Sequence, residues 1–363
     1  MAIKNLELIS FRNHKNRKFR FNKGLTVIWG ENGSGKTSIL EAIHLLSYGR
    51  SFRTRKQKDM INYTDNDLVV RGEFFLDNRK DEISALISKS KKQQIKLNGK
   101  KITGRKDIIG RNNVVVLSPE EQALTKGGPV ERRNFFDKLF STISPNYLNC
   151  LQAYTKTLKQ RNAVIELVKK NRNPISDIES WDEQIVKFGT ELWKQRYKYI
   201  VDFSSCFKSV SSAYNPSLKI SINYLKDPAT KNDYRELLKE SRHKDIVLGR
   251  TTAGPHRDDV IIKWCGKSLR QFGSQGEHKI SLVLLKLSEM LFIEEKTNKT
   301  PTLLLDDLFA KLDMERSKKI VNLLHVFENK PCQTVVTTTD LYNIEKIGLI
   351  KNGDNHSTIY IEK

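Results

Sequence analysis

The chain has 363 residues, which is long enough to bury two hydrophobic cores. Its 64 Lys and Arg side chains outnumber its 42 Asp and Glu side chains, giving a formal net charge of +22, and this excess predicts binding to a polyanion. No run approaches the roughly 18 apolar residues of a membrane-spanning helix, and no apolar signal core follows Met1. These features exclude a membrane-spanning helix and predict a cytoplasmic protein.

The first predicted site combines a short apolar strand with a glycine-rich loop. Residues 25–29 predict the strand, and the sequence after it fits G-x-x-x-x-G-K-[ST]. Lys36 is expected to reach the phosphates of ATP, and the Thr37 hydroxyl to ligate Mg²⁺. A helix predicted over 38–47 would direct its N-terminal dipole at the same phosphates. The predicted ATP-binding residues of this loop are Gly30, Glu31, Asn32, Gly33, Ser34, Gly35, Lys36 and Thr37.

The next stretch predicts several strands and a strongly basic segment. Strands are expected over 68–76, 82–88, 94–97 and 114–117. The segment 89–111 holds nine basic residues against Asp107 alone, and Asn98-Gly99 within it predicts a tight hairpin turn. These basic side chains have two interpretations, a surface that binds a polyanion or a solvated edge that prevents sheet pairing.

Helical periodicity replaces the strand pattern in the middle of the chain. Apolar residues recur at helical spacing over 151–168 and again over 185–199, and Asn171-Arg172-Asn173-Pro174 separates the two stretches. An antiparallel pair of helices with additional helices around it is therefore expected, followed by a short strand over 218–224.

A second motif lies at Phe272-Gly273-Ser274-Gln275-Gly276-Glu277, where a long helix is predicted to begin. Ser274, Gln275 and Gly276 could bind an anion at that helix N-terminus. Taken alone, the motif is equally typical of a glycine-rich turn.

An apolar strand predicted over 302–305 ends in two carboxylates, Asp306 and Asp307. Asp306 is expected to hold Mg²⁺, directly or through water. Asp307 is expected to act on the attacking water, either as a slow general base or as a positioning group. The alternative is an acidic turn without catalysis.

Two further positions stay open. Gln122 follows the strand predicted over 114–117, and it is either a nucleotide-sensing glutamine or an ordinary loop residue. A strand is predicted over 333–336, and Thr339 or Asp340 follows it. In ATPases with these motifs a histidine often stands at this place and contacts the γ-phosphate side.

The three motifs occur in the order typical of ABC-type ATPases, and other segments narrow the resemblance. The chain resembles the RecF family, bacterial DNA-repair ATPases of the SMC-like ABC group, over nearly its whole length. The segments that carry this resemblance are Phe11-Arg12-Asn13, Tyr48-Gly49-Arg50-Ser51-Phe52-Arg53, the run from Lys126 to Arg133, and Thr252-Ala253-Gly254-Pro255-His256-Arg257-Asp258-Asp259.

This resemblance implies an α/β fold, an ABC-type P-loop ATPase head with an inserted, mostly helical arm or lid domain. The halves of the head would be residues 1–137 and 246–363, and the arm residues 138–245. It also implies a DNA-stimulated ATPase with weak turnover, catalysed by Asp307 and Lys36 with ATP and Mg²⁺ as cofactors. Ser274, Gln275 and Gly276 would contact ATP held by a second copy, so that ATP drives homodimerisation.

The function implied is recombinational DNA repair and replication-fork maintenance, within the response to DNA damage and the SOS response. The dimer would clamp DNA near junctions of duplex and single strand, including gapped duplex, and help to load recombinase with RecR and RecO as partners. Slow hydrolysis would reset it.

Three other functions compete with this expectation. An SMC-like subunit of a chromosome or nuclease complex would need a long coiled coil, for which residues 138–245 are too short. A transporter's nucleotide-binding subunit leaves the charge of +22 unexplained. A small-molecule kinase needs neither the second motif nor the helical insertion.

Overall fold

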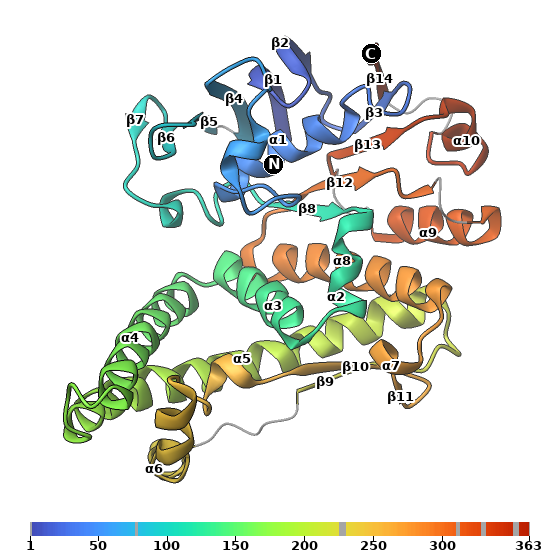
Figure 1. Cartoon of the computed structure of the whole chain (residues 1–363). Coiled ribbons are helices and arrows are strands. Elements are labelled where there is room, and N and C mark those ends of the chain that lie inside the picture. Colours follow the sequence, from blue (N-terminus) through green and yellow to red (C-terminus); the bar gives the residue numbers. More distant parts are fainter. Residues whose placement is uncertain are drawn as a thin grey trace. The chain divides into compact units, whose positions relative to one another are not determined.

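The computed structural model describes residues 2–76, 79–224, 230–309, 313–327, 332–350 and 356–362 (Figure 1). The chain forms two compact units. The sheet unit comprises Met1–Gln122, Ala213–Pro216 and Ile280–Lys363, and the helical unit comprises Ala123–Ser212 and Ser217–Lys279. The segments predicted from the sequence, 1–137, 138–245 and 246–363, stay a prediction.

A parallel sheet of five strands lies in the sheet unit, in the order β14-β3-β13-β12-β8. The strands β8, β12 and β13 are buried along their whole length, in keeping with their runs of Val and Leu, whereas β14 at one edge alternates exposed and half-buried residues. The five strands are β3 (Leu25–Trp29), β8 (Val114–Leu117), β12 (Thr302–Asp306), β13 (Thr334–Thr338) and β14 (His356–Tyr360).

The register of this sheet brings the ends of three strands together. Asp306 pairs with Thr337 between β12 and β13, and Thr338 pairs with Trp29 between β13 and β3. The carboxyl ends of these parallel strands therefore meet at one edge, where parallel α/β sheets bind their ligands.

An antiparallel sheet of six strands forms the second layer of this unit, in the order β2-β1-β4-β5-β6-β7. Asn98 and Gly99, with φ of 49° and 78°, make the tight turn between β6 and β7 that the sequence predicts. The six strands are β1 (Ala2–Phe11), β2 (His14–Arg20), β4 (Asp67–Leu76), β5 (Arg79–Ser88), β6 (Gln94–Leu97) and β7 (Lys100–Lys101).

The helix α1 (Lys36–Tyr48) lies between the two sheets, as Figure 1 shows, and is buried on almost every side. It contacts β4 and β5 of the antiparallel sheet and β12 and β13 of the parallel sheet. The other helices of this unit are α9 (Met314–Phe327), α10 (Leu341–Lys346), the part of α8 (Gln275–Thr297) from Ile280 onward, and the 3-10 helices η1 (Gln57–Met60), η2 (Arg105–Asp107) and η3 (Pro119–Gln122).

The helical unit is built on two long helices and a small sheet. The predicted helices on either side of residues 171–174 are confirmed as α4 (Pro145–Lys169) and α5 (Ser176–Tyr214). Three antiparallel strands pair in the order β11-β10-β9. The remaining elements are α2 (Ala123–Lys126), α3 (Pro129–Ile143), β9 (Ile220–Tyr224), α6 (Lys231–Leu248), η4 (Pro255–Arg257), β10 (Val260–Trp264), β11 (Lys267–Ser268) and α7 (Leu269–Phe272).

Aromatic side chains fill the core of the helical unit. The ring of Phe136 packs edge-on against Phe135 and Phe203, and the ring of Phe140 packs edge-on against Tyr147. Such edge-to-face pairs are worth about 0.5–1.5 kcal/mol each beyond the area that they bury. They fix α3, α4 and α5 to one another.

Candidate nucleotide-binding site

The glycine-rich loop joins β3 to α1 and adopts a backbone that requires glycine. Gly30, Gly33 and Gly35 have φ of 152°, 82° and 103°. A Cβ at Gly30 would collide with the backbone oxygen of Ile361, and one at Gly35 would lie 2.5 Å from Oδ1 of Asn13. Backbone N–H groups around such glycines form a concave surface that attracts anions.

Lys36, the first residue of α1, directs its ammonium into this loop. Its Nζ donates hydrogen bonds of 2.7 Å to the carbonyl oxygens of Gly30 and Glu31. Burial lowers the pKa of Lys36, and the charges of Asp307 and Asp306 oppose that shift. The ammonium is thus held at the point where a polyphosphate in the loop would meet it.

The turn between β1 and β2 supports the loop from outside. The amide of Asn13 donates from Nδ2 to the carbonyl of Gly33 at 3.2 Å, and Nε2 of His14 lies 3.1 Å from the carbonyl oxygen of Gly35. A carbonyl only accepts, so Nε2 of His14 carries the proton. Sequence reasoning missed both contacts, and it named Asn13 only within a segment of the family resemblance.

A buried carboxylate ties the same turn to α1. Glu41 is fully buried, and its two oxygens accept from Nε and Nη2 of Arg12 at 2.9 and 2.7 Å. The hydroxyl of Ser51 donates to the same carboxylate at 2.5 Å. A bidentate arginine–carboxylate pair fixes orientation as well as distance, so Arg12 holds the turn against the helix that carries Lys36.

Two threonines, Thr37 and Thr337, form hydrogen bonds with the acidic residues at the end of β12. The hydroxyls of Thr37 and Thr337 each donate to Oδ1 of Asp306 at 2.8 Å. Thr337 also accepts from the backbone N–H of Asp307 at 3.1 Å, and Asp307 has the uncommon φ of 48°. Burial raises the pKa of Asp306, while the two threonine hydrogen bonds lower it. Sequence reasoning missed Thr337.

These residues fit a nucleotide with Mg²⁺. Thr37 and Asp306 place a hydroxyl and a carboxylate oxygen side by side, which is the oxygen donor set that Mg²⁺ takes. The hydroxyl of Ser34 inside the loop is buried without a hydrogen-bond partner among the described residues, and a phosphate oxygen would satisfy it. The ion, when bound, neutralises phosphate charge and orders the terminal phosphates.

The second motif lies in the helical unit, at the start of α8. The backbone N–H of Ser274 donates to Oε2 of Glu277 at 2.7 Å, and the N–H of Glu277 donates to Oγ of Ser274 at 3.3 Å. This reciprocal pair is a capping box that fixes the first helical turn. Gln275 and Gly276 lie in that turn, so the predicted residues present a helix N-terminus.

The positions left open by the sequence lie after β8 and after β13. Gln122 ends η3, which follows β8, and the charge of the neighbouring Glu120 raises the pKa of Asp306 after the larger effect of burial. Asp340 caps α10 by accepting from the N–H of Tyr342 at 2.9 Å, and Thr339 lies between β13 and that cap. The assignment of Gln122, Thr339 or Asp340 as a nucleotide-sensing residue stays a prediction.

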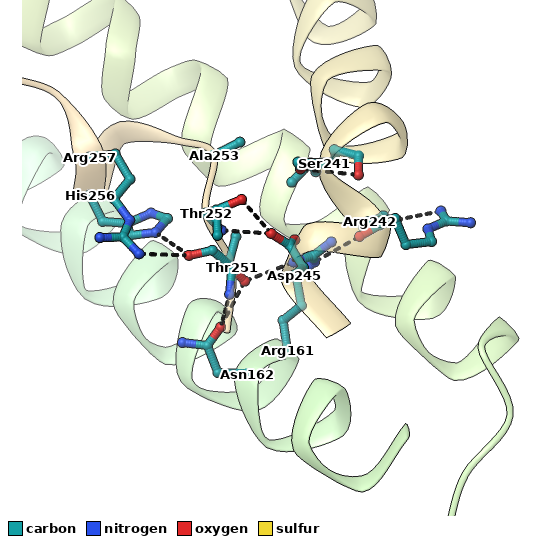
Figure 2. Close-up of polar contacts among 12 residues, drawn as sticks. Arg161, Asn162, Ser241, Arg242, Asp245, Thr251, Thr252, Ala253, His256 and Arg257 are labelled. Carbon is teal, nitrogen blue, oxygen red and sulfur yellow. Dashed lines mark hydrogen bonds and ion pairs between the residues drawn. The ribbon is translucent and has the colours of Figure 1, made fainter. Parts of the chain in front are cut away.

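The segment Thr252–Asp259 is bound into a polar cluster of the helical unit, shown in Figure 2. Asp245 on α6 is fully buried and accepts from Arg161 on α4 at 2.7 Å and from both the N–H and hydroxyl of Thr252. Thr251 accepts from Arg161 at 2.7 Å and donates to Asn162 at 2.7 Å. The cluster therefore joins α4, α6 and the loop after α6.

His256 and Asp258 extend these contacts. Nε2 of His256 lies 3.1 Å from the carbonyl oxygen of Thr251, and its Nδ1 lies 2.7 Å from the hydroxyl of Tyr154 (Figure 2 for the first of these). Asp258 accepts from the indole N–H of Trp193 at 2.6 Å. The segment is thus a structural hub of its unit.

Comparison with known proteins identifies the family and the fold. Residues 2–355 match the family model described as RecF/RecN/SMC N terminal domain. The chain is 35% identical over 357 residues to the DNA replication and repair protein RecF of Clostridium novyi, covering 95% of both chains. It is 33% identical to the protein of the same name from Clostridioides difficile, covering 98% of both.

Solved structures extend the comparison to the fold. A structure of the recombination mediator protein RecF with ATPrS in the RecFOR pathway superposes with a TM-score of 0.86 at 31% identity, covering 99% of this chain and 96% of that one. The Smc head domain of Pyrococcus furiosus has a TM-score of 0.55 at 19% identity, covering 95% of this chain and 91% of that one, and shares the fold alone. None of the helices in the described ranges is long and apolar enough to cross a membrane. With an ABC-type ATPase head fold and relatives of this identity along its whole length, the chain belongs to the RecF family.

Proposed function

We propose that this chain is an ATP-dependent DNA-binding protein of recombinational DNA repair and replication-fork maintenance. The observation that carries the proposal is the junction of loop and acidic strand, where Thr37 and Thr337 both bind Asp306 beside Lys36. Its relatives of known name are DNA replication and repair proteins, and the charge of +22 suits a nucleic-acid partner.

In this proposal the loop holds ATP and the acidic strand completes the site. Residues 30–35 offer backbone N–H groups, Lys36 binds the terminal phosphates, and Thr37 with Asp306 holds Mg²⁺. Asp307, placed by the N–H contact to Thr337, orients or deprotonates the attacking water. Because its side chain is one methylene shorter than the glutamate usual in ABC ATPases, turnover is slow, and DNA increases it.

The capped helix N-terminus supplies the link to a second copy. Ser274, Gln275 and Gly276 bind the γ-phosphate of ATP held by the partner chain, so each nucleotide contacts two subunits. ATP then favours the dimer because it binds the dimer better than the monomer, and the relation is reciprocal. The dimer clamps DNA at gapped duplex or a junction of duplex and single strand, and helps to load recombinase with RecR and RecO. We expect it to act in the cytoplasm during the SOS response.

The test uses the Asp307→Asn variant, which keeps the shape of the side chain but cannot act as a base. Light scattering is measured with no nucleotide, ADP or ATP, and repeated with gapped duplex DNA. A dimer that forms with ATP, but not with ADP or without nucleotide, and that retains DNA supports the proposal. A chain that stays monomeric with ATP in every condition overturns the shared-site mechanism.

The main alternative is an SMC-like subunit of a chromosome or nuclease complex, and the same experiment separates the two. Such a subunit would need a long coiled coil, whereas α4 has 25 residues and α5 has 39. Retention of gapped DNA by this chain alone favours the repair function.

A further inference from the structure

A concave basic surface lies in the sheet unit, away from the residues of the nucleotide site. It is a cavity of about 670 Å³ formed between η1 and the connection from β5 to β6. We call it the basic groove. It is lined by Arg55, Lys56, Gln57, Lys58, Asp59, Ile87, Ser88, Lys91, Lys92 and Gln93.

The charges of the basic groove are poorly balanced. Lys56, Lys58, Lys91 and Lys92 are all exposed, and within the described residues none of them forms an ion pair. Of the lining residues that the structure describes, Asp59 alone carries a carboxylate, and it accepts a hydrogen bond from the hydroxyl of Thr54 at 2.9 Å. Cations gathered in a concavity focus a positive potential there and raise the local concentration of anions.

Hydrogen bonds fix the walls of the groove. Gln57 on one wall donates to Gln93 on the other at 2.5 Å, and Gln93 donates to the carbonyl of Gly49, the C-cap of α1, at 3.4 Å. Nη1 of Arg12 donates to the carbonyl of Asp59 at 2.6 Å. The lysines therefore project from a frame tied to the nucleotide-binding helix, which lowers the ordering cost of binding.

The lining also indicates the chemistry of the ligand. Among the described residues that line it there is no aromatic side chain, so they offer no platform on which unpaired bases could stack. Gln57 and Gln93 are hydrogen-bonded to each other, and the four lysines suit phosphates, whose contacts position a protein on DNA without reading sequence.

We propose that the basic groove binds the sugar-phosphate backbone of duplex DNA. The inference rests on the proposed function and assigns part of the DNA contact to a defined place. The side chains that carry it are Lys56 and Lys58 on one wall and Lys91 and Lys92 on the other.

Two groove variants of the full chain and one matched control test the proposal. Lys56→Gln/Lys58→Gln and Lys91→Gln/Lys92→Gln each remove two charges from the groove. Lys15→Gln/Arg17→Gln removes two charges from exposed positions on β2, outside it. Binding to a fluorescent duplex with ATP present is measured by anisotropy across a salt series. Each groove pair should weaken binding and lower the log–log salt slope by about 1.8, because each phosphate that a lysine no longer neutralises reduces the slope by about 0.9.

The outcomes separate this inference from the proposed function. Lys91→Arg/Lys92→Arg keeps the charge and should keep the wild-type slope. Groove variants that bind as tightly and with the same slope as the β2 control overturn the groove assignment, while the proposed function stands. If the unmodified chain binds no duplex with ATP at low salt, both fail. Unchanged ATP affinity of each variant shows that it is folded.

Discussion

At the scale of single residues, the first prediction concerns Lys36, whose ammonium lies inside the glycine-rich loop. Its ammonium donates to two carbonyls of the loop, and in the proposed function these hydrogen bonds are exchanged for hydrogen bonds to phosphate oxygens when ATP binds. Lys36→Ala removes a charge-assisted interaction worth about 2–3 kcal/mol. We expect ATP affinity to fall by about two orders of magnitude, measured by calorimetric titration. Lys23→Ala, an exposed lysine before β3, should leave that affinity unchanged, and equal losses in both variants would refute the assignment.

Thr337 gives a second prediction at this scale. Its hydroxyl donates to Asp306 and accepts from the N–H of Asp307, so Thr337→Val leaves both groups without this partner in nearly the same shape. We expect ATP turnover to fall more than ATP affinity, because the carboxylates lose their alignment while the loop is intact. Initial rates and nucleotide titrations of the same preparation provide the comparison. A Thr337→Ser variant, which keeps the hydroxyl, should retain most of the activity.

These two residues also show how far the sequence could predict the site. Lys36 was predictable because the loop motif is contiguous and its chemistry depends on local spacing. Thr337 lies 30 residues beyond Asp307, and only the pairing of β12 with β13 brings the two together. Asn13 and His14 act on backbone carbonyls of the loop, and a contact between a turn and a distant backbone leaves no periodic signal in the sequence.

Among the structural elements, η4, in the connection after α6, carries a half-buried histidine, His256, with a strongly lowered pKa. Burial lowers the pKa of His256 to about 4, although the Thr251 carbonyl opposes the shift, and Arg257 and Arg133 lower it further while Asp245 raises it. Since Nε2 faces that carbonyl and carries the proton, Nδ1 accepts from the hydroxyl of Tyr154. Protonation of Nδ1 would break that hydrogen bond.

This arrangement predicts a pH-dependent stability of the helical unit. Above pH 6.5 the imidazole is neutral in both the folded and unfolded chain. As the pH falls toward 4, the unfolded chain binds a proton that the folded chain resists, so the free energy of unfolding declines, by at most about 3 kcal/mol. His256→Gln should flatten this decline in urea unfolding followed by tryptophan fluorescence. A loss of stability that is equal at pH 7 and pH 5 would mean that the histidine has only a packing role.

At the level of elements, the sequence predicted the helices and strands whose apolar residues follow a regular pattern and missed those without one. Four strands of the parallel sheet, β3, β8, β12 and β13, and the helices α4 and α5 were predictable because their apolar residues recur with a clear period or run. The edge strand β14 was not predicted. β2 was not, because in His14–Arg20 only Phe19 is apolar and its pairing with β1 supplies the order. The helix α6 was predicted only as an unspecified additional helix, although Thr230 and Asp233 form its capping box.

On the scale of the whole molecule, the proposed function connects the capped turn at Ser274 with formation of the dimer. Ser274 and Glu277 fix the first turn of α8 by reciprocal hydrogen bonds, and the proposed function gives this N-terminus to ATP on a partner chain. Ser274→Arg fills that position with a bulky cation and removes the serine hydroxyl, while residues 30–37 are untouched. We therefore expect the Ser274→Arg variant to bind ATP with the affinity of the unmodified chain in its monomeric state.

The oligomeric state is the decisive measurement. Light scattering with ATP should give a monomer for Ser274→Arg and a dimer for Ser212→Arg, which places the same residue at an exposed position of α5. Nucleotide titration on both variants establishes that neither has lost the loop site. If Ser274→Arg dimerises with ATP as the control does, the γ-phosphate is not held by this helix N-terminus. ATP-dependent dimerisation would then need a cause other than a nucleotide shared between two chains.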